Sequence, residues 1–64
     1  MNQLPRFLRL MDQNMKHVVL VSLHRIVYMR PNMTGTRLYF GDCFDLDVVE
    51  SMEEIEEFIK EMYS

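Results

Sequence analysis

The chain has 64 residues, of which 48% are hydrophobic, a formal net charge of −3 and a single cysteine, Cys43. One cysteine excludes a disulfide framework and the multi-cysteine zinc sites, although a domain of this size buries only about 60% of its unfolded surface and needs additional stabilisation. Oligomerisation is the remaining common means, so we expect one domain, residues 1–64, that needs no cofactor and forms a homo-oligomer, most simply a dimer.

Two strands are predicted near the N-terminus. Residues 7–11 are mostly apolar, and the polar cluster Asp12-Gln13-Asn14 that follows them is typical of a turn. Residues 15–21 contain the run Val18-Val19-Leu20-Val21, whose β-branched side chains favour a strand. Two strands joined by a short polar turn predict a β-hairpin.

Three further strands are predicted over residues 26–30, 36–40 and 44–48. Pro31 ends the first of these strands, because proline has no N–H to donate to a sheet ladder. A polar turn with Gly35 separates the first strand from the second. The sequence therefore predicts a second antiparallel unit after the hairpin.

The last two of these strands have a predicted register. Their apolar residues share one face only when the numbers of paired residues sum to an even value, because side chains alternate with period two. A three-residue loop, residues 41–43, satisfies this rule, and it requires a left-handed backbone that Cys43 would have to adopt at some cost. The predicted pairs are Phe40 with Phe44, Tyr39 with Asp45, Leu38 with Leu46, Arg37 with Asp47, and Thr36 with Val48.

A C-terminal helix is predicted from Ser51 to Tyr63. Ser51 and Glu54 have the spacing of a capping box, which satisfies otherwise unpaired amide donors of the first turn. Apolar residues then recur at the helical spacing along one side, and we expect this stripe to pack on the sheet and to bury Phe58. The predicted fold class is α+β, a small antiparallel sheet of four to five strands with one C-terminal amphipathic helix packed on one face.

The charges are divided along the chain. Residues 1–37 contain six basic residues and one acidic residue, whereas residues 38–64 contain nine acidic residues and one basic residue. This division predicts that a basic half and an acidic half attract each other, within one chain or between two. The alternative is that opposite charges alternate over a folded sheet and cancel.

The segment "VSLHRIVYMRPNMTGTRLYFGDCFDLDV", residues 21–48, resembles the core strands of the LytTR DNA-binding domains. With the helix entry that follows it, "ESMEE", it is also similar to the family of the small flagellar protein FlbD. The resemblance to LytTR domains implies that polar residues in loops between strands reach DNA, and here these are Arg30, Asn32 and Thr34. The chain is shorter than a LytTR domain and lacks the basic segment that follows its core.

Few residues suit catalysis or metal binding. His17 and His24 lie in different predicted segments, and Cys43 lies in a turn without a cationic neighbour that would activate its thiol. The aspartates of "GDCFDLD" do not have the spacing of a calcium loop, and no glycine-rich phosphate loop is present. We therefore expect no enzymatic activity.

The sequence indicates a cytoplasmic protein. No apolar run approaches the roughly 20 residues that a membrane-spanning helix needs. The first residues are interrupted by Pro5, Arg6 and Arg9, so they contain no apolar segment of secretory length. A single free cysteine is typical of a reducing compartment.

The function predicted first is that of a protein-interaction module. One helix covers only one face of a sheet, so the apolar and aromatic residues of the other face would meet a second copy or a larger protein partner. The predicted interaction surface consists of Tyr28, Arg30, Arg37 and Tyr39. In a homo-oligomer the two arginines would meet the acidic residues Asp45 and Asp47 of the neighbouring copy.

The alternative function is that of a LytTR-like DNA-binding regulatory protein. In this interpretation Arg30, Asn32 and Arg37 contact the nucleic acid, and the basic residues of the N-terminal half neutralise phosphates. The acidic C-terminal half and a sequence pI of about 5.2 oppose it, because DNA-binding domains are usually basic.

Overall fold

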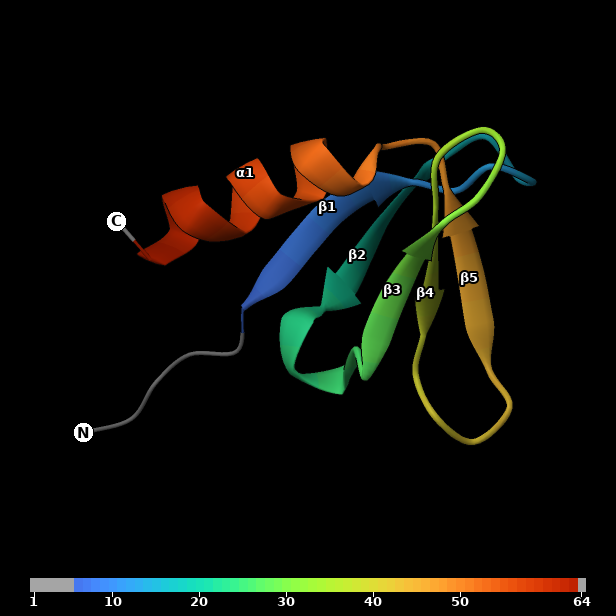
Figure 1. Ribbon diagram of the computed structural model, residues 1–64, viewed down its shortest axis with the longest axis horizontal. Coiled ribbons are helices and arrows are strands. Elements are labelled where there is room, and N and C mark those ends of the chain that lie inside the picture. Colours follow the sequence, from blue (N-terminus) through green and yellow to red (C-terminus); the bar gives the residue numbers. More distant parts are fainter. Residues whose placement is uncertain (1–5, 64) are drawn as a thin grey trace.

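The computed structural model describes residues 6–63, so the two ends of the predicted domain, including Pro5, lie outside the described residues. This part of the chain contains five antiparallel strands and a C-terminal α-helix (Figure 1), which confirms the α+β fold class. The elements are, in chain order, β1 (Phe7–Met11), β2 (Val18–Ser22), the 3₁₀ helix η1 (Leu23–Arg25), β3 (Tyr28–Pro31), β4 (Thr36–Tyr39), β5 (Asp45–Val48) and α1 (Met52–Tyr63).

The strands form two sheets rather than the single sheet that the sequence suggested. β1 pairs with β2, whereas β3, β4 and β5 pair in that order. The sheets join at one corner, where the Val49 N–H donates to the Met11 carbonyl oxygen at 3.0 Å. Asp12 and Val48 form an isolated antiparallel bridge at this corner. Pairing does not continue into β1, because the Met11 N–H donates instead to both side-chain oxygens of Glu50, at 3.0 and 3.1 Å.

The turn between β1 and β2 is longer than predicted, and β2 begins at Val18 rather than at Met15. One carboxylate oxygen of the buried Asp12 accepts hydrogen bonds from the N–H groups of Asn14, at 2.7 Å, and Met15, at 3.0 Å. Lys16 follows in the left-handed conformation, with φ 63°. This side-chain capped turn holds Met15 and Lys16 out of the ladder.

β4 and β5 pair in the predicted register, which is confirmed. The ladder closes with a hydrogen bond of 3.1 Å from the Phe40 N–H to the Phe44 carbonyl oxygen. The loop residues Gly41, Asp42 and Cys43 have φ values of 78°, 47° and 62°. Three successive residues are therefore left-handed, and Cys43 is among them as predicted.

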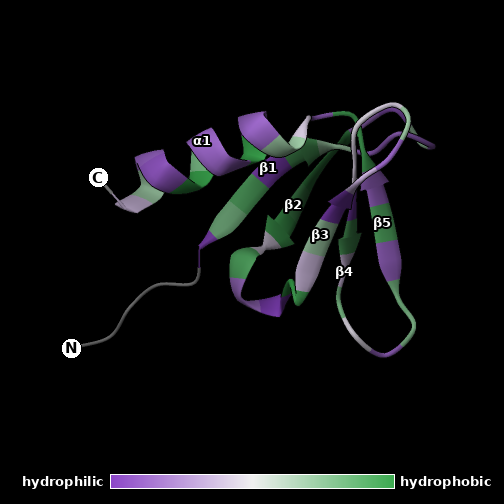
Figure 2. Ribbon diagram, in the orientation of Figure 1, coloured by the Kyte–Doolittle hydropathy of each residue, from purple (hydrophilic) through white to green (hydrophobic). Residues whose placement is uncertain are grey.

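The predicted capping box is also confirmed at the start of α1. The Ser51 N–H donates to Glu54 Oε1 at 2.8 Å, and the Glu54 N–H donates to Ser51 Oγ at 3.1 Å. The helix turns its hydrophilic residues away from the sheets (Figure 2). Within residues 6–63, no helix has the length and apolar character needed to cross a bilayer.

The core lies between the two sheets and the helix, since each of them contributes to it. Phe58 is not part of it, contrary to the sequence-based expectation, because the helical stripe is centred on Ile55 and leaves Phe58 37% exposed beside Phe7. Leu46, which pairs with Leu38 in the hairpin, is only partly buried. The buried apolar residues are Leu8, Leu10, Val21, Leu38, Val48 and Ile55.

Candidate interaction surfaces

The outer face of the three-stranded sheet brings together the four residues predicted to form the interaction surface. Tyr28 lies opposite Tyr39 and Arg30 lies opposite Arg37 in the β3–β4 register. The two tyrosine rings are stacked, with centroids 4.4 Å apart and planes inclined by 15°. Tyr28 is 51% exposed, so the pair presents an aromatic surface to solvent.

Arg37 is held by an ion pair within the chain. Its Nε donates to Asp47 Oδ1 at 2.8 Å and its Nη2 donates to Asp47 Oδ2 at 3.1 Å. Asn32 Nδ2 also donates to Oδ1, at 3.0 Å. The hydrogen bonds from Arg37, assisted by Asn32, hold the pKa of the Asp47 carboxyl below its usual value, although partial desolvation acts in the opposite direction.

The two arginines of the predicted interaction surface differ in whether they form an ion pair within the chain. Arg37 and Asp47 join the basic and acidic halves of the sequence within one chain. The expected contact of Arg37 with the aspartates of a neighbouring copy stays a prediction. Arg30 has no carboxylate partner among the described residues and lies beside the like charge of Arg37. Asn32, a predicted nucleic-acid contact, is engaged by Asp47, which leaves Arg30 as the available residue of that set.

A shallow groove of about 300 Å³ borders the tyrosine pair. Its charged residues are Asp42 and Asp45, and both are exposed. Phe44 and Val27, which are 60% and 65% exposed, provide apolar walls. The groove therefore combines aromatic, apolar and negatively charged groups.

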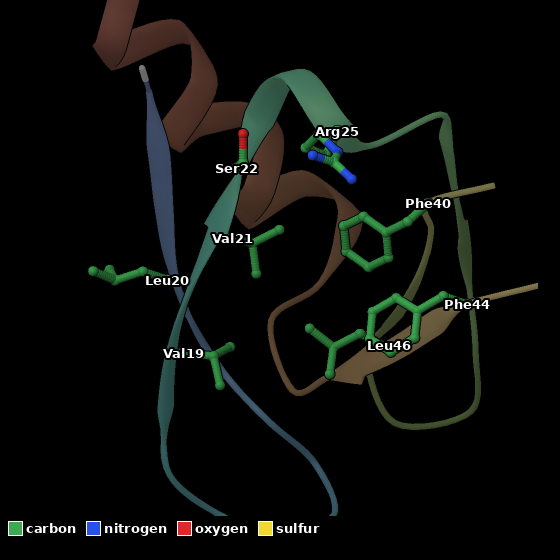
Figure 3. A pocket seen from close by; sticks show the side chains of 8 residues that line it. All are labelled: Val19, Leu20, Val21, Ser22, Arg25, Phe40, Phe44 and Leu46. Atoms are coloured by element: carbon green, nitrogen blue, oxygen red, sulfur yellow. The ribbon is translucent and has the colours of Figure 1, made fainter. Parts of the chain in front are cut away.

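A second groove, of about 400 Å³, lies between β2 and the β4–β5 hairpin. Val19 and Val21 point into it from β2, and Phe40, Phe44 and Leu46 face them from the hairpin (Figure 3). Several of these apolar residues also pack against the hydrophobic core, so the core is accessible to solvent at this groove. Sequence analysis did not identify this groove, although the uninterrupted run of residues 18–21, apolar on both faces of its strand, was a signal for it.

The residues considered for chemistry remain dispersed on the surface. His17, His24 and Cys43 are exposed. Among the described residues, no group of three or more His, Cys, Asp or Glu side chains comes together as a metal site. No family model, curated protein or solved structure matches this chain. The geometry of the two surfaces is therefore the basis for assigning a function.

Proposed function

We propose that this chain is a small, non-enzymatic protein-interaction module that self-associates and docks a protein partner. The observation that carries the proposal is the stacked pair Tyr28–Tyr39, in which Tyr28 is half-exposed and Tyr39 is partly buried, next to Arg30, which has no ion-pair partner among the described residues. Tyrosine and arginine are among the residues that contribute most to binding energy at protein interfaces.

The chemistry of the surface defines the partner. A basic side chain would enter the groove, where Asp45 neutralises it and the Tyr28 and Tyr39 rings attract a cation, a contact worth about 0.5–1 kcal/mol at an exposed site. A carboxylate of the partner would bind Arg30 and relieve its repulsion from Arg37. The partner is therefore a protein segment with a basic and an acidic side chain in neighbouring positions.

The proposal is tested by comparing capture of proteins from extracts of the source cells by three immobilised forms of the chain. Wild type and the control Met33→Lys, which changes a fully exposed turn residue, should capture the same protein. Arg30→Glu should lose it, because charge reversal repels the partner carboxylate. The captured protein is then purified and its binding measured in solution. Equal affinity for wild type and Arg30→Glu would rule out this surface.

The LytTR-like alternative stays a prediction with a separate test. An electrophoretic shift of mixed-sequence DNA at micromolar protein, weakened by salt and by Arg30→Glu, would favour DNA binding over protein docking. We place it second because the Asp47 carboxylate engages both Asn32 and Arg37.

A further inference from the structure

β2 is an apolar strand with an unpaired edge. In the part of the chain that the structure describes, it pairs with β1 on one side and with no strand on the other. Its sequence, VVLVS, contains no charged residue and no proline, and it is hydrophobic over nearly its whole length (Figure 2). Edge strands are usually protected by charges, proline or bulges, because an unprotected edge pairs with another strand.

The ladder with β1 fixes which backbone groups of β2 face this edge. The Leu23 N–H donates to the Arg6 carbonyl oxygen at 2.9 Å, and the Asp12 N–H donates to the His17 carbonyl oxygen at 3.0 Å. Hydrogen-bonded pairs recur at every second residue of an antiparallel ladder. The odd-numbered residues of β2 therefore direct their N–H and C=O groups to β1. The backbone N–H and C=O groups of the even-numbered residues, Val18, Leu20 and Ser22, are directed to the free edge.

We propose that two copies of this chain pair through this edge, β2 against β2 in antiparallel orientation, about a two-fold axis at Leu20. This inference rests on the self-association proposed above, and it identifies the edge of β2 as the surface through which the two copies bind. Leu20 is the middle of the three edge-facing residues, so a two-fold axis there pairs all three sets of backbone groups. The resulting pairs are Leu20 with Leu20, Val18 with Ser22, and Val19 with Val21.

β2 brings no charge of its own to the axis. Arg9, on β1, lies opposite Leu20, and Arg25, which follows β2, lines the same groove. Two Arg9 side chains would be separated by three strand spacings, about 14 Å, which exceeds the screening length of about 8 Å at physiological salt. The other edge strands of the described residues carry charges or proline, which oppose the same pairing: β1 contains Arg9, β3 contains Arg30 and ends in Pro31, and β5 contains Asp45 and Asp47.

The pairing also covers apolar surface that one chain leaves open. Leu20, which points away from the groove (Figure 3), is 61% exposed and would pack against its own copy across the axis. Val19 and Val21 of the second copy would extend the inner face of β2 beside the exposed Phe44. The groove between β2 and the hairpin would then be closed by the partner copy.

The proposal is tested by sedimentation at tens of micromolar protein with two opposite charge variants. Wild type and the control Met33→Lys should be dimers. Leu20→Lys and Leu20→Glu should each be folded monomers by circular dichroism, because like charges would face each other across the axis. An equimolar mixture of the two should restore the dimer. A monomeric wild type, a dimer that survives both substitutions, or a mixture that stays monomeric would overturn the proposal.

The register is tested by a cysteine crosslink in a Cys43→Ser background. Leu20→Cys should give a disulfide-linked dimer on mild oxidation, since Cα atoms of a hydrogen-bonded antiparallel pair are about 5.5 Å apart. Val18→Cys should remain uncrosslinked, because its copy is four residues away along the strand, about 13 Å. Equal crosslinking of both variants would contradict the axis at Leu20.

Partner docking on the outer face and dimerisation through β2 can be disproved independently of each other. Arg30→Glu should abolish partner capture and leave the dimer intact, whereas Leu20→Lys should abolish the dimer and leave the outer face able to capture the partner. A dimer lost in Arg30→Glu and retained in Leu20→Lys would place self-association on the outer face and would overturn the assignment to β2.

Discussion

Gly35, in the turn before β4, lies so close to the end of β5 that a Cβ atom there would overlap the carbonyl oxygen of Val48. The carbonyl carbon and oxygen of Val49 would each be 2.9 Å from the same Cβ. All three are backbone atoms in the segment that joins the two sheets. The turn therefore needs glycine for its small size.

We expect Gly35→Ala to lower the free energy of unfolding by about 1–3 kcal/mol or more, because backbone must move to admit the methyl group. For a small domain each kcal/mol lowers the Tm by about 4–8 °C. The matched control is Gly41→Ala, where φ is +78° and the nearest atom, Val27 Cγ2, is 3.7 Å from the Cβ. That change meets only the left-handed penalty of about 1 kcal/mol. Thermal melting that shows Gly41→Ala to be the more harmful change would contradict the steric argument.

The burial of the helix residues reverses the sequence-based expectation about which side chain anchors the helix. Ile55 is fully buried, whereas Phe58 is 37% exposed. Ile55→Ala should therefore cost about 2–5 kcal/mol, and Phe58→Ala should cost less than the 3–5 kcal/mol typical of a buried phenylalanine. Urea unfolding of the two variants measures the difference. A larger loss for Phe58→Ala would mean that the aromatic ring, and not Ile55, anchors the helix.

The parts of the fold that follow from local rules could be predicted from the sequence. The β4–β5 register depends on the period of two and on loop length, and the helix start depends on Ser51 and Glu54, so both are readable over a few residues. The division into two sheets depends instead on Glu50 and Met11, which are far apart in the chain. A carboxylate that replaces a strand as the partner of a backbone N–H leaves no periodic signal.

The candidate site was predictable to a similar extent. Alternation placed Arg37 and Tyr39 on the outer face, and the β3–β4 register then set Tyr28 and Arg30 beside them. The groove along β2 could not be predicted, because its walls belong to both sheets and the angle between them is set by the shared corner.

The pKa of Asp47 predicts how stability depends on pH. Because hydrogen bonds from Arg37 lower the pKa of this carboxyl in the folded chain, its contribution to stability is complete above the unfolded pKa of about 3.9. The contribution is lost as the pH falls through the lower, folded pKa. Arg37→Gln should raise the pKa of Asp47 in an NMR titration and weaken the loss of stability below about pH 4. An unchanged titration would mean that Arg37 does not stabilise the carboxylate in solution.

The loop between β4 and β5 contains two non-glycine residues in a conformation that favours glycine. The Phe44 N–H donates to the Gly41 carbonyl oxygen at 2.9 Å across Asp42 and Cys43, whose φ values are both positive. This is the geometry of the hairpin turn that prefers the pair Asp-Gly. Cys43→Gly should therefore raise the free energy of unfolding by about 0.5–1 kcal/mol, part of the left-handed penalty being offset by the greater freedom of glycine in the unfolded chain. Cys43→Ala, which removes the thiol and keeps a Cβ, should give no gain, and an equal gain in both variants by urea unfolding would assign the effect to the thiol instead of the backbone.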